Sequence, residues 1–190
     1  MAIGASAGGF AALERLLGEL PAGFPPAVFV VLHLDRQRKS LLTALLARRA
    51  QMTVRPAVED EEIHGGTVYI AVPDFHLQVR ADHIRLVKSS LVHFTRPAVD
   101  RLFESVALAY GPHAVGVVLT GAGGDGADGV VAIRRAGGVT IAQAPADAAY
   151  SAMPLAAIAT GCVDHVVPLA GIAGTLLQLC AAPAAPLAES

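Results

Sequence analysis

The sequence predicts an α/β fold, a doubly wound and mostly parallel sheet with an inserted antiparallel hairpin. The first observation is a set of short apolar runs without polar alternation, as expected for strands buried on both faces. The second is that helical segments separate these runs, an order that favours parallel strands joined by crossover helices. The runs behind the first observation are residues 28–32, 67–71, 114–119 and 139–142.

The helices are predicted from residue spacing and from end signals. Within residues 10–17, the side chains of Leu13, Leu16 and Leu17 share one helical stripe, and Gly18 is a stop signal. Asp125 is a candidate N-cap for the helix that follows it. The later helices are predicted over residues 40–49, 98–110 and 126–136, and residues 169–182 are one more candidate.

The inserted hairpin is the third observation. Leu77 and Val79 alternate with polar residues, Ile84 and Leu86 do the same, and residues 81–82 form the turn between them. The chain length suits one domain, which we expect over residues 1–180. Residues 181–190 are rich in Ala and Pro, so we expect them to form a flexible C-terminal tail.

Composition excludes several classes of protein. Of the 190 residues, 54% are hydrophobic and 16% are charged, which provides a large core and argues against intrinsic disorder. The net charge is -2 and the pI is near 6.4, so no basic surplus favours binding to nucleic acid. Two cysteines, Cys162 and Cys180, are too few for a disulfide framework, which favours a reducing compartment.

One apolar stretch raises the question of a membrane span. Residues 166–188 carry no charge, but Pro168, Pro183 and Pro186 interrupt them. The uninterrupted part extends about 21 Å as a helix, short of a hydrocarbon core of roughly 30 Å. No basic segment precedes an apolar run at the N-terminus, so there is no secretory signal. We therefore expect a cytoplasmic protein that is not inserted in a membrane.

A small-residue turn around Ser6 is the first candidate for chemistry. Residues 4–9 read Gly-Ala-Ser-Ala-Gly-Gly, where a short first strand must turn into the first helix. Such a turn lifts a serine hydroxyl above the sheet edge, and the helix N-terminus behind it favours a developing anion. Two interpretations stay open for this motif alone: a nucleophile elbow, or a Gly-rich turn in which Ser6 is an ordinary N-cap.

Nucleotide cofactors fit the same turn poorly. Ser6 stands where a dinucleotide fingerprint needs its second glycine, and no Gly-Lys-Ser/Thr of a phosphate-binding loop is present. None of the three tyrosines has a lysine four residues later, as a short-chain dehydrogenase would have. We expect no organic cofactor and no metal.

A histidine and an aspartate follow two other predicted strands. His33 ends the run Val-Val-Leu-His, where it could accept the hydroxyl proton of Ser6. Asp125 lies in the Gly-rich turn after residue 119, where it could orient His33 and stabilise its protonated form. Individually each has a structural explanation, a strand-end histidine and a helix cap. Because active sites of such sheets lie at the carboxyl ends of the strands, the three together predict a Ser-His-Asp triad.

Several ordered motifs carry a more specific resemblance. They are Ile-Gly-Ala-Ser-Ala-Gly-Gly at residues 3–9, Val-Leu-His at 31–33, Arg-Pro-Ala-Val-Asp at 96–100, Leu-Thr-Gly-Ala-Gly-Gly-Asp-Gly-Ala at 119–127, Ala142-Gln143 and Met153-Pro154. In this order they resemble the CheB methylesterase domain, over residues 2–175. The resemblance implies a doubly wound α/β sheet, with Ser6 as nucleophile, His33 as general base and acid, and Asp125 as the residue that orients it. It further implies an oxyanion hole made by the backbone amides of Ala122 and Ala7.

The implied reaction is hydrolysis of glutamate methyl esters on the cytoplasmic helices of methyl-accepting chemoreceptors. Some relatives also deamidate receptor glutamines through the same kind of acyl-enzyme. The sequence departs from the family pattern at Ala7, Ala122 and Gly124, where Thr, Met and Asn are common, and after His33, where Met-Pro is common. Many relatives carry an N-terminal receiver domain for which these residues leave no room. The sequence thus represents either a stand-alone esterase or one domain of a longer protein.

Other polar clusters have two interpretations each. A basic cluster after His33 either steers a glutamate-rich substrate or is a solvated face, the interpretation we favour. It consists of Arg36, Arg38, Lys39, Arg48 and Arg49. His64, His76 and His83 surround the hairpin without metal-ligand spacing, and we favour surface histidines over a metal site.

Two other functions remain as alternatives. A different serine hydrolase would use Ser6, Asp125 and His165, the order common in α/β-hydrolases, but only one strand fits before Ser6. A non-catalytic adaptor of the same fold would bind receptor tails, although a binding module has no need of a complete triad.

Overall fold

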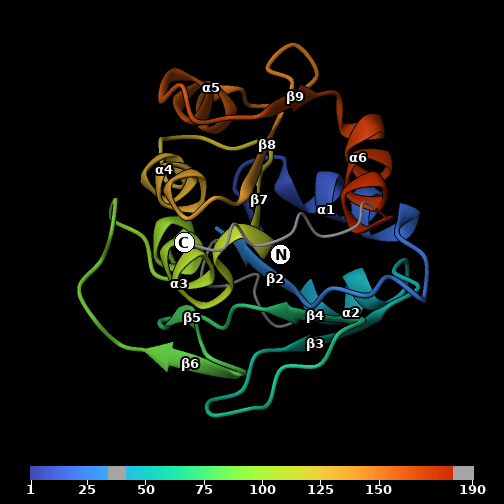
Figure 1. Cartoon of the computed structure of the whole chain (residues 1–190), viewed down its shortest axis with the longest axis vertical. Helices are drawn as coiled ribbons and strands as arrows, with labels where there is room; N and C mark the ends of the chain where they lie inside the picture. Colours follow the sequence, from blue (N-terminus) through green and yellow to red (C-terminus); the bar gives the residue numbers. More distant parts are fainter. Residues whose placement is uncertain (34–41, 182–190) are drawn as a thin grey trace, which may run out of the picture.

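The computed structural model describes residues 1–33 and 42–181. Seven strands form one sheet in the order β3-β4-β2-β1-β7-β8-β9, and every neighbouring pair is parallel (Figure 1). The predicted parallel sheet is therefore confirmed. The strands are β1 (Ala2–Ala5), β2 (Val28–Leu32), β3 (Thr53–Pro56), β4 (Thr67–Ile70), β7 (Val115–Val118), β8 (Val139–Gln143) and β9 (His165–Val167).

Helices cover both faces of this sheet, which produces three layers (Figure 1). One face carries α1 (Gly9–Glu19), α2 (Leu42–Ala47) and α6 (Leu169–Ala181), and the other carries α3 (Val99–Tyr110), α4 (Ala127–Arg135) and α5 (Ala152–Ala159). A short 3-10 helix, Gly111–His113, follows α3. Side chains of the central strands alternate between two apolar clusters: Ile3 and Val30 face the first, Ala2 and Val31 the second.

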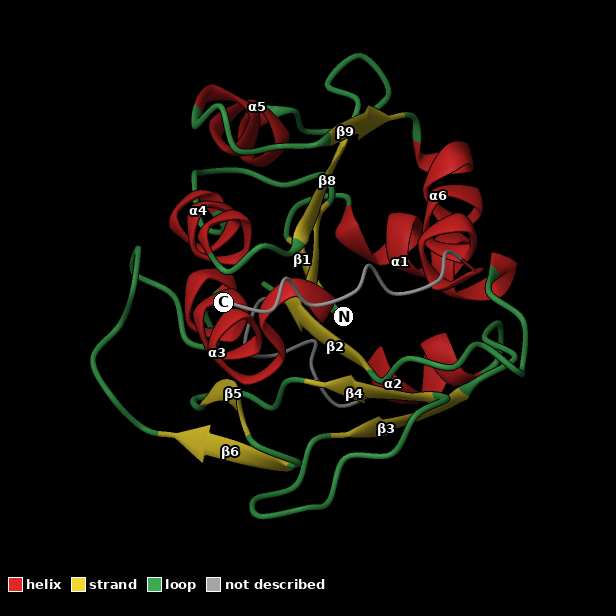
Figure 2. Cartoon of the chain, viewed as in Figure 1, coloured by secondary structure: helices red, strands yellow, loops and turns green. Residues whose placement is uncertain are grey.

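A hairpin forms a separate two-stranded sheet against α3 (Figure 2). It consists of β5 (His76–Arg80) and β6 (His83–Val87), which pair antiparallel and confirm the predicted insertion. The amide of Val79 donates a hydrogen bond of 3.0 Å to Ser105 Oγ, which ties the hairpin to the helix. Its turn places Ala81 at a φ of 54°.

A close approach between β1 and α3 sets the position of the helix. A Cβ on Gly4 would overlap Cγ1 of Val99 and lie 2.7 Å from its Cγ2, so only glycine lets the start of α3 reach the sheet. Ser6 follows β1, and Asp125 accepts hydrogen bonds from the first turn of α3, so the approach of β1 to α3 helps set the separation of Ser6 and Asp125.

The element predictions differ from the structure mainly at the edges. The strands β3 and β9 were not predicted, because each is short and exposed at an edge and lacks a buried apolar run. The helix α5 was also not predicted, since it is almost wholly apolar and has no polar face. Ala181, the first residue of the predicted tail, ends α6 instead. The rest of that tail and Ser40 lie outside the described residues. Within residues 1–33 and 42–181, no helix is long and apolar enough to cross a membrane.

Candidate active site

Ser6 and His33 lie side by side because their strands are neighbours. The strands β1 and β2 pair in parallel with Ala5 opposite Leu32, so the next residue of each strand reaches the same carboxyl edge. The amide of His33 donates to Ala5 O at 3.0 Å, and the amide of Ser6 donates to Thr120 O at 3.0 Å. The sheet therefore joins the ends of β1, β2 and β7 at one place, as the sequence predicts.

The turn after Ser6 is tight because its neighbours are small. Gly8 has a φ of 75°, and a Cβ on Gly9 would lie 2.7 Å from both Ala5 Cβ and Leu32 Cδ1. The amide of Gly9 donates to Ser6 O at 2.8 Å, so α1 begins directly behind the serine. Ser6 is half-buried at the N-terminus of a helix, a position that favours negative charge on a bound group.

The turn after β7 packs against Ser6. A Cβ on Gly121 would lie 2.8 Å from Ser6 Cβ and would overlap the sulfur of Met153, so this position requires glycine. Ala122, the predicted oxyanion-hole residue, follows directly and is exposed. The amide of Ala122 therefore lies on the turn that packs against Ser6.

Thr120 connects the turn after β7 to three other segments through hydrogen bonds. Its amide donates to Gln143 Oε1 at 2.9 Å, and its hydroxyl donates to Ala7 O at 3.0 Å while accepting from the amide of Tyr150 at 2.8 Å. These contacts link the turn that holds Ala122 to the turn that holds Ser6. The motif residues Gln143 and Met153 thus support the site rather than contribute chemistry.

His33 and Asp125 form the closest contact between candidate catalytic side chains. His33 Nε2 lies 2.9 Å from Asp125 Oδ2, and the side chains are 13% and 4% exposed. Such burial strengthens the electrostatic interaction between an imidazolium and a carboxylate. Because Nε2 faces Asp125, Nδ1 is the ring nitrogen left for a proton from another group.

Asp125 does not cap the helix that follows it, which corrects the sequence prediction. Gly126 occupies the N-cap of α4 with a φ of 104°, and no side chain caps that position. The Asp125 carboxylate instead accepts from two amides of α3, that of Val99 at 2.7 Å and that of Asp100 at 2.9 Å. Burial opposes its ionisation, but the contact with His33 and the hydrogen bonds from the amides of Asp100 and Val99 outweigh burial and lower the pKa of this carboxyl.

Asp100 is a buried group near the site that sequence reasoning did not assign. Its Oδ1 accepts from the amides of Gly126 and Gly129 at 2.9 and 2.8 Å, and His93 Nε2 lies 3.1 Å from Oδ2. Burial, with Asp125 nearby, raises the pKa of this carboxyl to about 6. The motif at residues 96–100 contains Asp100 and was the available signal in the sequence. The hydrogen-bond partners of Asp100, however, are more than 20 residues away along the chain.

The remaining predicted clusters are not brought together as sites. His76 is buried, which corrects the prediction of a surface histidine, and its Nδ1 accepts from the amide of Ala98 at 3.2 Å. His83 is partly exposed and contacts Asp82 at 2.7 Å. His165 begins the edge strand β9, three strands from β1, which leaves the alternative triad without support. Arg36, Arg38 and Lys39 lie outside the described residues, while Arg48 and Arg49 are exposed.

Among residues 1–33 and 42–181, the group of metal-ligand types close enough to hold an ion is His93, Asp100 and Asp125, with donor atoms within 4.8 Å of one another. Both carboxylates already accept backbone hydrogen bonds. The set therefore fits a hydrogen-bonded network at least as well as a metal centre.

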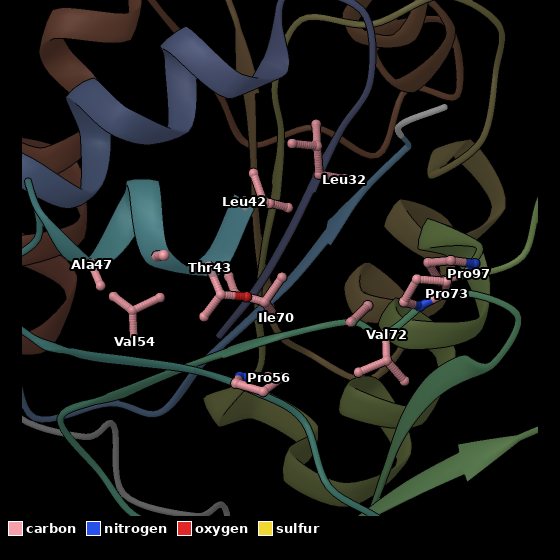
Figure 3. Close-up of a pocket in the computed structure, with 12 residues that line it drawn as sticks. Leu32, Leu42, Thr43, Ala47, Val54, Pro56, Ile70, Val72, Pro73 and Pro97 are labelled. Carbon is pink, nitrogen blue, oxygen red and sulfur yellow. The ribbon is translucent and has the colours of Figure 1, made fainter. Parts of the chain in front are cut away.

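An apolar pocket of about 410 Å³ is lined in part by Leu32, the residue before His33 (Figure 3). Leu32 and Leu42 lie on one side, Val72 and Pro97 on another, and Thr43 adds a hydroxyl. Because Leu32 precedes His33 and Pro97 lies just before α3, the pocket adjoins the candidate site.

Comparisons with known proteins point to one family. A family model described as CheB methylesterase matches residues 1–176. Protein-glutamate methylesterase/protein-glutamine glutaminase 1 of Cupriavidus pinatubonensis is 41% identical over 181 residues, covering 95% of this chain and 53% of that protein. A putative protein of the same description from Leptospira interrogans is 35% identical, covering 93% of this chain and 92% of that protein.

A solved structure is also similar. The crystal structure of the Thermotoga maritima CheB methylesterase catalytic domain matches with a TM-score of 0.91 and 34% identity, over 94% of this chain and 96% of that one. The chain spans about half the length of several curated relatives, including those from Cupriavidus pinatubonensis and Gluconobacter oxydans.

Proposed function

Because this chain belongs to the CheB methylesterase family, we propose that it is a serine hydrolase that removes methyl esters from glutamate side chains of chemoreceptors. We propose deamidation of receptor glutamines as a second reaction at the same site, since the relatives are named for both activities. The observation that carries the proposal is the contact of 2.9 Å between His33 and Asp125, beside a serine on the neighbouring strand end.

The proposed reaction begins at Ser6. Its Oγ attacks the ester carbonyl carbon while His33 takes the hydroxyl proton at Nδ1, the nitrogen that does not face Asp125. Asp125 stabilises the imidazolium, and the amides of Ala122 and Ala7 stabilise the oxyanion. His33 then gives its proton to the leaving methoxide, and methanol departs from an acyl-enzyme.

Water completes the cycle. His33 takes a proton from the water that attacks the acyl carbonyl and returns it to Ser6 Oγ as the ester bond breaks. The products are a glutamate carboxylate and the free serine. With a glutamine substrate, His33 gives its proton to the amide nitrogen as the C–N bond breaks, so ammonia departs in place of methanol, and every other step is the same.

The proposed substrates are the cytoplasmic helices of methyl-accepting chemoreceptors, which places the protein in the cytoplasm. The apolar pocket next to His33 suits a side chain that neighbours the modified glutamate on such a helix. A net charge of -2 gives no support for nucleic acid as a partner.

The test is methanol release from a methylated receptor cytoplasmic fragment. We expect Ser6→Ala to reduce kcat by at least about 10³-fold, because the nucleophile is lost while the fold is retained. The control is Ser89→Ala, which removes an exposed hydroxyl and should leave the rate unchanged.

A fluorophosphonate probe separates the outcomes. Labelling of Ser6 in the wild type without methanol release would indicate a serine hydrolase with another substrate. Absence of both labelling and release would contradict catalysis and favour a receptor-binding adaptor.

A further inference from the structure

Two buried carboxylates cap each other's helices next to His33. Asp125 precedes α4, yet its carboxylate accepts from the first amides of α3, while Asp100 lies in α3 and accepts from the amides of Gly126 and Gly129 at α4. The amide of Asp100 itself donates to Asp125 Oδ1 at 2.9 Å. Only 2% of Asp100 and 4% of Asp125 is exposed. The position of Asp125 is therefore defined by Asp100 through several separate bonds.

Two carboxylates this close oppose each other's ionisation, and the surrounding charges decide which of them is ionised. Asp125 faces His33 on the end of β2, and Asp100 faces His93 on the loop before α3. His76 of β5 contacts the backbone of Ala98 beside them. Asp128, in the first turn of α4, is exposed, and Arg96 contacts the carbonyl of Ser89 instead.

The loop holds His93 against Asp100 in an unfavourable backbone conformation. Val92 and Thr95 exchange two backbone hydrogen bonds across a tight turn, and the residues between them have positive φ angles, 47° for His93 and 61° for Phe94. Turns of this kind favour Asn and Gly, and a phenylalanine there is strained. The hydroxyl of Thr95 then reaches Asp125 Oδ2 at 3.4 Å. Strain that persists beside a candidate site is a reason to look for a function.

We propose that Asp100 is a positioning residue of the active site, which orients Asp125 and adds negative charge behind His33, and that His93 is the partner that favours its ionised form. This inference rests on the proposed function. When Asp100 is ionised, its charge favours the imidazolium that forms on His33 during attack by Ser6. When Asp100 is protonated, its hydrogen bonds to α4 persist through the carbonyl oxygen, and only the charge is lost.

The sharpest variant is Asp100→Asn, which keeps an acceptor for the amides of Gly126 and Gly129 and removes the charge. Because burial raises the pKa of Asp100 to about 6, the wild type carries a neutral group there at lower pH. The ratio of variant to wild-type kcat/KM should be near one at acid pH. Above neutrality it should fall to about one fifth.

The measurement is methanol release between about pH 5 and 8.5, with Asp128→Asn as the matched control. That variant removes an exposed charge from the first turn of the same helix, α4, and its ratio should stay near one throughout. A ratio for Asp100→Asn that does not change with pH would overturn the charge role, since a purely structural defect acts at every pH.

A second variant keeps the proposal testable if Asp100→Asn folds poorly. His93 is on an exposed loop, so His93→Gln should fold. It should lower kcat/KM most near pH 6 to 7, because without the contact from His93 more of Asp100 stays protonated there. The double variant should be no worse than Asp100→Asn alone, because both act through one carboxylate. Additive losses would overturn the pairing. An inactive wild type would instead refute the proposed function.

Discussion

The buried carboxylates make stability depend on pH at the scale of single residues. Burial raises the pKa of Asp100 from 3.8 to about 6 in the folded protein. The folded state therefore binds a proton more tightly than the unfolded state between these values. The contribution of Asp100 to stability falls as pH rises from about 4 to 6 and stays low above that.

We predict that Asp100→Asn is more stable than the wild type at pH 7.5, by a few degrees in Tm. The asparagine side chain does not ionise, so the variant avoids the cost of burying a charged carboxylate. The advantage should disappear below about pH 4, where Asp100 is protonated in both states. Thermal unfolding followed by circular dichroism at several pH values measures this. A variant less stable than the wild type at pH 7.5 would show that the ionised carboxylate is the favoured cap.

Asp125 behaves oppositely, because hydrogen bonds lower its pKa despite burial. Its contribution to stability is present above about pH 4 and is lost as pH falls through the folded pKa.

We predict that Asp125→Asn lowers kcat by about 10³-fold or more, since the imidazolium of His33 loses its counter-ion. Methanol release by the folded variant tests this, and activity within tenfold of the wild type would remove Asp125 from the mechanism.

At the scale of elements, the distance between β1 and α3 sets the geometry of the site. We predict that Gly4→Ala lowers stability by about 2 kcal/mol and also lowers activity, because the added methyl overlaps Val99 and displaces the first turn of α3. The matched control is Gly174→Ala in α6, where a Cβ meets nothing within 4 Å. That substitution should stabilise by about 0.5–1 kcal/mol through helix propensity.

Urea unfolding and methanol release measure both variants. Adding Val99→Ala to Gly4→Ala should recover part of the activity, because it makes room for the new methyl. An active Gly4→Ala variant with wild-type stability would contradict the close approach.

How much of the fold the sequence predicts also depends on the element. Buried central strands such as 28–32 show an uninterrupted apolar run, so they were predicted, whereas the edge strand His165–Val167 is exposed and carries no such run. Ser6, His33 and Asp125 were predicted because parallel strand ends share an edge. The capping by Asp100 was not, since its partners are 26 and 29 residues away and the pairing exists only once α3 and α4 pack together.

At the scale of the whole molecule, the sheet separates two apolar clusters, of which the second lies with α3 and α4 behind the site. We predict that Leu176→Ala, in the first cluster under α6, costs about 3 kcal/mol of stability and leaves kcat/KM unchanged while the protein is folded. Its neighbour Leu177 is 39% exposed, so Leu177→Ala should cost less than about 1 kcal/mol. Denaturant unfolding with parallel assays of methanol release tests the pair. A loss of activity matching the loss of stability would show that the two faces are functionally coupled.

The crossed caps of α3 and α4 make the proposed active site depend on contacts between distant parts of the chain. Asp125 is held by amides of the segment at residues 99–100, and His33 comes from the other side of β1, so no isolated fragment of the sheet contains a finished site. We therefore predict that a partly refolded molecule regains secondary structure before it regains the proposed esterase activity. Recovery of hydrolysis after dilution from urea should lag behind recovery of helical signal, and the enzyme's own turnover then reports that the last long-range contacts have formed.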